Sequence, residues 1–197
     1  MLSTTVIRFG WDDRLFHALN AGGGAALDRV MLLLSERSFG YVFGGAVAVL
    51  VLALRGRAAI RPLLAMGLAL AVSDLVGARV LRPLFDRARP CYALPPGTFR
   101  WIGPAQDVGS LPSLHASNYF ALALTAALAE RRLAPFAYAV AIAVAVSRVY
   151  LGVHWPSDVL AGAAWGTCCG AIGHALAALT RRMHHPAPGG GPAPRDP

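Results

Sequence analysis

Five long apolar segments limit what this 197-residue chain can fold into. Most of them approach the roughly 20 residues that an α-helix needs to cross a bilayer. Hydrophobic residues make up 56% of the chain and charged residues only 14%, whereas a soluble domain carries about a quarter charged residues. The sequence therefore predicts an all-α fold, a polytopic membrane helical bundle. The segments are Phe39–Leu54, Pro62–Leu81, Pro112–Ala129, Pro135–Gly152 and Pro156–Thr180.

The two ends of the chain differ in composition from this apolar middle. The stretch Trp11–Leu34 mixes charged and apolar residues, which is typical of an amphipathic helix at the membrane interface, although a sixth span is an alternative. After residue 182 the chain is rich in Pro and Gly, a composition typical of disorder. We therefore expect an interfacial segment at 1–38, a transmembrane unit of five to six helices at 39–182 and a disordered tail at 183–197.

Arginine supplies every basic side chain of this protein, because its 18 basic residues include no lysine. The formal net charge is +8, yet the arginines are separated by apolar runs and form no continuous basic face, so nucleic acid is not an expected partner. Guanidinium groups bind phosphate oxygens in a planar, bidentate geometry. The expected partners are therefore membrane lipids and a phosphate-bearing lipid substrate, while the sequence leaves the oligomeric state open.

The placement of the arginines also predicts the orientation in the membrane. If five spans alternate, three Arg-bearing connections fall on one side, which the positive-inside rule makes cytoplasmic. The connection 82–111 and the turn around His154 then face outside the cytoplasm, and an anionic substrate would explain why that connection is also rich in Arg. We expect a protein of the bacterial inner membrane whose active site faces outward. The cytoplasmic connections lie at residues 55–61, 131–132 and 181–182.

Three polar motifs lie at the ends of the segments that face this outer side. A polar group at the edge of a span is costly unless it pairs or binds something, so motifs that converge from separate segments indicate a site. The motifs are Arg82-Pro-Leu-Phe-Asp-Arg-Ala-Arg89-Pro90, Leu111-Pro-Ser113-Leu-His115-Ala-Ser117 and Ser147-Arg148-Val-Tyr-Leu-Gly-Val-His154-Trp-Pro-Ser-Asp158.

His154 and Asp158 form the most informative pair in these motifs. Their i to i+4 spacing includes Pro156, which suits the first turn of a helix, so the carboxylate can fold back toward the imidazole. A carboxylate at one ring nitrogen leaves the other nitrogen unprotonated and able to attack phosphorus, and it stabilises the charge that grows on the ring. The alternative is an acidic residue at a helix start beside an interfacial histidine.

His115 and Ser113 lie at the start of the third apolar segment. A protonated His115 would donate to the leaving oxygen and later deprotonate the attacking water. The alternative is a histidine that only lines or caps the helix start. The Ser113 hydroxyl is either a helix N-cap or a ligand of phosphate, two roles that look the same in sequence.

Three arginines would surround the oxygens of a transferring phosphoryl group with positive charge: Arg82, Arg89 and Arg148. Arg148 lies near the end of an apolar segment, where an unpaired guanidinium is costly, whereas Arg82 could instead extend to lipid headgroups. We expect Arg87 and Arg100 to contact headgroups or solvent. No compact set of His or carboxylate ligands indicates a metal site, and no cofactor is expected.

These motifs resemble those of the type 2 phosphatidic acid phosphatase (PAP2) family, which shares its site with vanadium haloperoxidases. The third motif, Ser147 to Asp158, matches the family pattern in full. In the first motif Arg82 replaces a Lys, and in the second Leu114 replaces a Gly whose backbone N–H is expected to approach the phosphate.

The resemblance implies a metal-free helical bundle in which His154 is the nucleophile, Asp158 its orienting partner and His115 the general acid and base. Family members act on phosphatidate, phosphatidylglycerol phosphate or undecaprenyl diphosphate at the outer face of bacterial membranes. We therefore expect hydrolysis of a lipid phosphate or diphosphate through a phosphohistidine. The alternatives are a phosphotransferase with the same site and a silent lipid-phosphate binder. The resemblance assigns phosphate binding to Arg82, Arg89, Ser113, Leu114 and Arg148.

Overall fold

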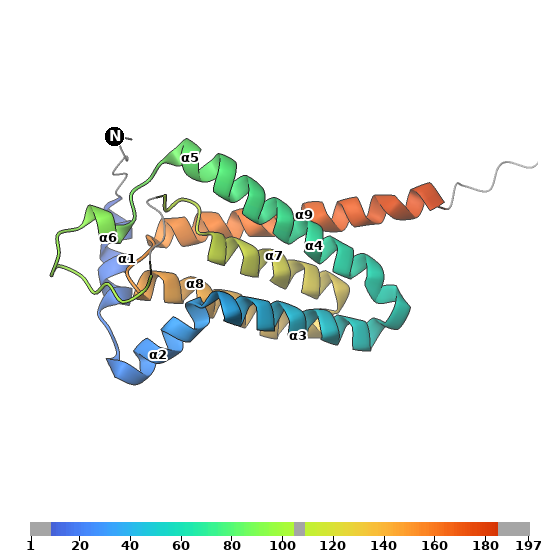
Figure 1. Ribbon diagram of the computed structural model, residues 1–197, viewed down its shortest axis with the longest axis horizontal. Helices are drawn as coiled ribbons and strands as arrows, with labels where there is room; N and C mark the ends of the chain where they lie inside the picture. Colours follow the sequence, from blue (N-terminus) through green and yellow to red (C-terminus); the bar gives the residue numbers. More distant parts are fainter. Residues whose placement is uncertain (1–8, 105–108, 185–197) are drawn as a thin grey trace, which may run out of the picture.

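Five long helices run along one another in the computed structural model of the chain (Figure 1). The structure describes residues 9–104 and 109–184, so most of the predicted tail, residues 185–197, lies outside it. Each predicted apolar segment forms one of the long helices, which confirms the all-α fold class. These helices are α3 (Arg37–Arg55), α4 (Ile60–Val76), α7 (Leu114–Ala129), α8 (Ala134–Tyr150) and α9 (Pro156–His184).

Three helical stretches of the described chain are long and apolar enough to cross a membrane. The first contains two antiparallel helices, because the chain reverses at the 3-10 turn η1 (Gly56–Ala59) and α4 returns along the bundle (Figure 1). The 16-residue helix α7 is apolar but shorter than these stretches. The three stretches are Arg37–Phe85, Arg131–Tyr150 and Pro156–Leu179.

Helix α7 lies at the centre of the bundle and packs against α4, α8 and α9. Small residues allow a close approach of α9, since a Cβ atom at Gly162 or Gly166 would collide with the carbonyl oxygens of Ser113 and Ser117. Close van der Waals packing of this kind is a main source of association between membrane helices. It places the start of α9 directly against the start of α7, where two of the polar motifs lie.

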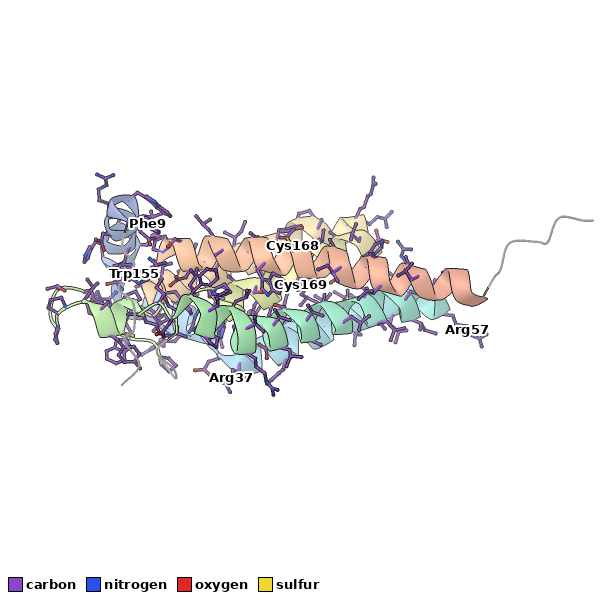
Figure 2. The ribbon with its side chains drawn as sticks, turned by 90° about the horizontal axis from the view of Figure 1, so that it is seen from above. Phe9, Arg37, Arg57, Trp155, Cys168 and Cys169 are labelled. Carbon is purple, nitrogen blue, oxygen red and sulfur yellow. The ribbon has the colours of Figure 1, made fainter. Side chains whose placement is uncertain are left out.

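Two shorter helices, α1 (Gly10–Asn20) and α2 (Gly24–Ser35), precede the five long ones. α1 lies across one end of the bundle beside Trp155, whereas Arg57 marks the opposite end (Figure 2). Phe16 of α1 is fully buried, with its ring centroid 5.2 Å from that of Trp155. Burial of this aromatic pair fixes α1 over the turn between α8 and α9.

An irregular turn interrupts the helix that leads into the first motif. α4 continues through the π-helical turn η2 (Gly77–Leu81) into the short helix α5 (Arg82–Phe85). Such π-turns are rare and are often found at functional sites. Asp86, which has a left-handed backbone with φ 39°, then ends the helix. A short loop follows and leads into α6 (Pro90–Ala93).

The connection between α8 and α9 is also tightly specified. Gly152 has φ +79°, and a Cβ atom there would collide with the carbonyl oxygen of Arg100. Only glycine has both the conformational freedom and the small size that this close passage requires. Pro156 then begins α9, because its fixed φ suits a first helical turn and its missing N–H would have no helical partner there. Gly152 and Pro156 therefore constrain the backbone on both sides of Val153–Trp155.

Candidate active site

The three polar motifs meet at the end of the bundle that α1 covers. His154 lies in the turn between α8 and α9, and Asp158 lies in the first turn of α9. The first motif follows α4, and the second begins α7. The buried members of this group are His154, Asp158, Ser113, Arg89 and Arg148, while Leu114, His115 and Arg82 are half-buried.

His154 is contacted at both ring nitrogens. Nδ1 lies 3.4 Å from Asp158 Oδ2, at the outer limit of a hydrogen bond, and Arg89 Nη1 donates to Nε2 over 2.8 Å. Arg89 Nη1 also donates to the carbonyl of Val153 over 2.9 Å. Because a guanidinium only donates, the contacts favour the tautomer with a lone pair on Nε2 and the proton on Nδ1. This is the tautomer expected of a nucleophilic histidine oriented by Asp158.

The surroundings of His154 keep its ring neutral. Burial lowers the pKa of His154 well below its ordinary value of 6.5, and the positive charges of Arg89, Arg148 and Arg82 lower it further. A neutral imidazole is the form that attacks phosphorus. Within residues 9–104 and 109–184, no group of three His, Cys, Asp or Glu side chains could hold a metal ion.

Ser113 connects the starts of α7 and α9. Its backbone N–H donates to the carbonyl of Asp158 over 3.0 Å. Although Ser113 occupies the N-cap position of α7, its hydroxyl makes no capping bond. That hydroxyl is buried and has no hydrogen-bond partner among the residues described. The geometry therefore favours the ligand-binding interpretation of Ser113 over the helix-cap alternative.

His115 and Arg82 lie at the more accessible side of the site. His115 Nε2 is 3.1 Å from the carbonyl of Ser35, at the end of α2. A carbonyl only accepts, so Nε2 carries the proton in this contact. Arg82 Nε lies 3.4 Å from the carbonyl of Pro112. Arg82 and His115 are both half-buried, whereas His154 is 1% exposed.

Leu114, which departs from the family pattern, directs its side chain toward the π-turn. A Cβ atom at Gly77 would lie 2.5 Å from Leu114 Cδ2 and 3.6 Å from Trp165 Nε1. The missing side chain at Gly77 therefore makes room for the added one at Leu114. This pairing shows where the extra side chain of the second motif is accommodated.

The expectation that Arg87 contacts lipid headgroups or solvent is wrong. Arg87 is 1% exposed and donates to Asp158 Oδ1 and to Asp12 Oδ2, in each case over 2.6 Å. Its guanidinium also lies 5.5 Å from the ring centroid of Trp155. Arg87 is not one of the residues that define the family motif, so the sequence indicated no role for it in the site. Its partner Asp12 lies 75 residues away, next to Asp13, and the sequence does not distinguish these two carboxylates.

Arg100 is also paired, although its side chain is 36% exposed. Its guanidinium donates to both carboxylate oxygens of Asp28, over 3.0 and 2.8 Å, and lies 5.6 Å from the ring centroid of Tyr150. The predicted contact with headgroups or solvent therefore omitted its main partner. Arg100 ties α2 to the end of α8, away from the contacts of Asp158.

Comparisons with known proteins agree with this arrangement. The family model of the PAP2 superfamily matches residues 61–184. The decaprenylphosphoryl-5-phosphoribose phosphatase of Mycobacterium tuberculosis is 33% identical over 152 residues, which cover 75% of this chain and 82% of that protein. The undecaprenyl-diphosphatase of Sulfolobus acidocaldarius is 32% identical over 164 residues, which cover 78% of this chain and 72% of that protein.

A third relative is the lipid A 4'-phosphatase of Bacteroides thetaiotaomicron, which is 34% identical over 135 residues. That match covers 64% of this chain but only 60% of the length of the relative. All three relatives are phosphatases by name, and each name refers to a phosphorylated lipid.

Two solved structures have the same fold. LpxE of Aquifex aeolicus superposes with a TM-score of 0.69 at 24% identity and covers 86% of this chain and 98% of that one. The transmembrane PAP2-type phosphatidylglycerolphosphate phosphatase of Bacillus subtilis superposes with a TM-score of 0.63 at 23% identity and covers 88% and 87%. Together with the apolar helices, these findings define an integral membrane phosphatase. The chain belongs to the PAP2 superfamily.

The contact between Leu114 and Gly77 gives the first testable prediction. Gly77→Val should lower the melting temperature of the detergent-solubilised protein by roughly 5 °C, because overpacking typically costs about 1–3 kcal/mol. Adding Leu114→Ala should recover part of that loss, since it empties the space that the valine needs. Gly67→Val on α4 is the control, because a Cβ atom there meets nothing within 4 Å. Strictly additive losses from Gly77→Val and Leu114→Ala would contradict the pairing.

Proposed function

We propose that this protein hydrolyses a lipid phosphate or polyprenyl diphosphate through a covalent phosphohistidine at His154, without a metal ion. The observation that carries the proposal is the state of His154. Its Nδ1 faces a buried carboxylate, and its Nε2 lone pair faces the guanidinium of Arg89. A neutral imidazole oriented in this way, among several arginines, is suited to attack a phosphoryl group.

In the first half-reaction, Nε2 of His154 attacks the terminal phosphorus as the bond from phosphorus to the lipid-side oxygen breaks. His115 gives a proton to the departing oxygen. The product is a lipid alcohol from a monophosphate, or a lipid monophosphate from a diphosphate. The positive charge on the phosphorylated ring is stabilised by Asp158, whose carboxylate faces Nδ1.

In the second half-reaction, His115 takes a proton from a water molecule whose oxygen attacks the phosphohistidine. The bond between nitrogen and phosphorus breaks, and inorganic phosphate leaves. His154 returns to its neutral form, and His115 is again protonated for the next turnover. The same residue thus serves as acid and then as base.

Phosphate binding in this proposal requires Arg89 to change partners. Its Nη1 donates to His154 Nε2 over 2.8 Å. Phosphoryl oxygens bind a guanidinium more strongly than a neutral imidazole does, so Arg89 moves its donors onto the phosphoryl group as Nε2 attacks. Further donors would come from Arg82, Arg148, the Ser113 hydroxyl and the backbone N–H of Leu114 at the start of α7.

The substrate class is supported by the relatives and by the position of the site. The names of the three relatives refer to lipid A, decaprenylphosphoryl-5-phosphoribose and undecaprenyl diphosphate. In this chain the half-buried Arg82 and His115 lie at the ends of apolar helices. We expect the phosphate to reach His154 from that side while the lipid tail stays in the bilayer.

The proposed location is the bacterial inner membrane, with five spans and the active site outside the cytoplasm. The spans are formed by α3, by α4 with α5, and by α7, α8 and α9. Arg57, in the turn between α3 and α4, lies at the end of the bundle opposite Trp155 (Figure 2). The positive-inside rule assigns the Arg57 end to the cytoplasm and the His154 end to the outer side.

The hydrolysis is tested with purified protein in detergent and excess EDTA. We expect phosphate release from at least one of undecaprenyl diphosphate, phosphatidate and phosphatidylglycerol phosphate, because the proposed chemistry needs no divalent ion. His154→Ala should reduce that release by a factor of 10⁴ or more, on the order of what loss of a nucleophile costs in other hydrolases.

Two outcomes would contradict this proposal. Release that stops when EDTA is added and returns with a divalent cation would contradict metal independence. Release that persists in a folded His154→Ala protein would contradict the assignment of the nucleophile. A matched melting temperature of the variant and the wild type serves as the control for folding.

The orientation is tested by cysteine labelling in intact cells. Thr98→Cys and Arg57→Cys are made separately in a protein whose three native cysteines are replaced by alanine. Thr98 and Arg57 are both exposed. The connection between α6 and α7, which contains Thr98, and the turn η1, which contains Arg57, lie at opposite ends of the bundle (Figure 1). A membrane-impermeant maleimide should label Thr98→Cys in intact spheroplasts and Arg57→Cys only after lysis. The reverse pattern would contradict the proposed orientation.

A further inference from the structure

Arg87 lies buried between the first and the last helix of the chain. Its Nη1 donates to Asp158 Oδ1 and Ser157 Oγ, and its Nη2 donates to Asp12 Oδ2, each over 2.6 Å. The ring of Trp155 lies against the same guanidinium, with its centroid 5.5 Å away. One guanidinium therefore joins α1 to the first turn of α9, which carries the orienting carboxylate of the site.

Asp12 binds the same turn of α9 from the side of α1. It is fully buried, its Oδ1 accepts from the Ser157 N–H over 2.8 Å, and its Oδ2 accepts from the Ser157 hydroxyl. N–H groups at a helix start lack helical partners, and a negative charge is stabilised there. Asp12 lies outside residues 61–184, the part of the chain that the family model matches.

The two oxygens of Asp158 have different partners. Oδ1 accepts from Arg87, whereas Oδ2 accepts from the backbone N–H of Trp155 over 2.9 Å and faces His154 Nδ1 at 3.4 Å. A rotation of the carboxylate would break the short bond to Arg87. Arg87 and the Trp155 N–H therefore together hold Oδ2 beside the imidazole.

We infer that Arg87 and Asp12 are positioning residues of the reaction: Arg87 fixes the Asp158 carboxylate beside the His154 ring, and Asp12 holds Arg87 in place. This inference rests on the proposed role of His154 as nucleophile. It gives the N-terminal helix α1 a part in catalysis, although no residue of α1 belongs to the three motifs. It also implies that the charges of Arg87 and Asp12 both change the electrostatic potential at the His154 ring.

The charges of the pair act on the ring in opposite directions. Arg87→Met removes a positive charge from the surroundings of the ring, so with Asp158 ionised His154 should become protonated at a higher pH. Without the charge of Asp12, Arg87 is less neutralised, so His154 should become protonated only at a lower pH. A role in folding alone gives no reason for shifts of opposite sign. The other charged or titratable groups that face the ring are Arg82, Arg89, Arg148 and His115.

The test compares Arg87→Met and Asp12→Asn with Arg100→Met. Arg100 is the matched control because it also binds an acidic residue of an N-terminal helix, Asp28, and also lies over an aromatic ring. Two readouts are taken for each purified protein in detergent. One is kcat and KM for dioleoyl phosphatidate across pH, and the other is ¹⁵N NMR of histidine-labelled protein, in which His154→Ala identifies the signal of interest.

We expect Arg87→Met to lower kcat by about 10–100-fold, while KM changes by less than about threefold. Losses of this size are typical when the hydrogen-bond partner of a metal-ligating side chain is removed, and Arg87 is the comparable partner of Asp158. The acidic limb of kcat/KM, and the midpoint of the His154 titration, should move to higher pH in Arg87→Met. Both should move to lower pH in Asp12→Asn. Each midpoint should shift by roughly half a pH unit when one of these charges is removed. Arg100→Met should match the wild type in both readouts.

The outcomes separate this inference from the proposed function. If the wild-type protein hydrolyses no lipid phosphate but the two His154 titrations shift in opposite directions, the positioning pair is supported and the proposed hydrolysis is not. If the wild type is active but Arg87→Met behaves like Arg100→Met, the pair is overturned.

Arg87→Met leaves two buried carboxylates without their guanidinium and is therefore the variant most prone to misfolding. Asp12→Asn retains the contact between Arg87 and Asp158 and decides the question if Arg87→Met does not fold. An Asp12→Asn titration that equals the wild type, or that moves to higher pH, would overturn the inference.

Discussion

A charge that is buried at the end of an apolar bundle has to be paired, and this requirement connects the separate parts of the structure. Asp158 has no exposed surface, and burial of an unpaired carboxylate is strongly unfavourable. Arg87 supplies the pairing charge, and Asp12 of α1 balances Arg87 in turn. The N-terminal helix is thereby fixed over the site. His154, which is the neighbour of the same carboxylate, is held in the tautomer that a nucleophile needs.

Close helix packing gives this charged group a rigid base. Glycines on α9 allow its first turns to approach the backbone of α7, and the Ser113 N–H donates to the carbonyl of Asp158. The starts of the two helices are therefore in direct contact. Arg89 donates to His154 Nε2, and in the proposed reaction the phosphoryl oxygens would replace this nitrogen as acceptors.

Most of the fold could be predicted from the sequence, because a helix that spans a bilayer needs roughly 20 consecutive, mainly apolar residues, and such runs are visible in the sequence. The spacing of His154 and Asp158 also predicted their contact, because Pro156 begins a helix whose first turn brings Asp158 back toward the imidazole. The sequence also predicted that the three motifs converge, but not the contacts that support the site from outside them. Asp12 and Arg87 are 75 residues apart, and no local pattern marks either one. The accommodation of Leu114 likewise depends on Gly77 in another helix, which only the packing of α4 against α7 brings close.

In the proposed reaction, His154 becomes covalently phosphorylated during turnover. The most direct test is a rapid alkaline quench of the protein with ³²P-labelled phosphatidate, followed by mass spectrometry of the peptide that contains residue 154. We expect alkali-stable, acid-labile phosphate on His154 during steady-state hydrolysis and none in His154→Ala. Hydrolysis at the full rate with no phosphate on His154 at any quench time would contradict it.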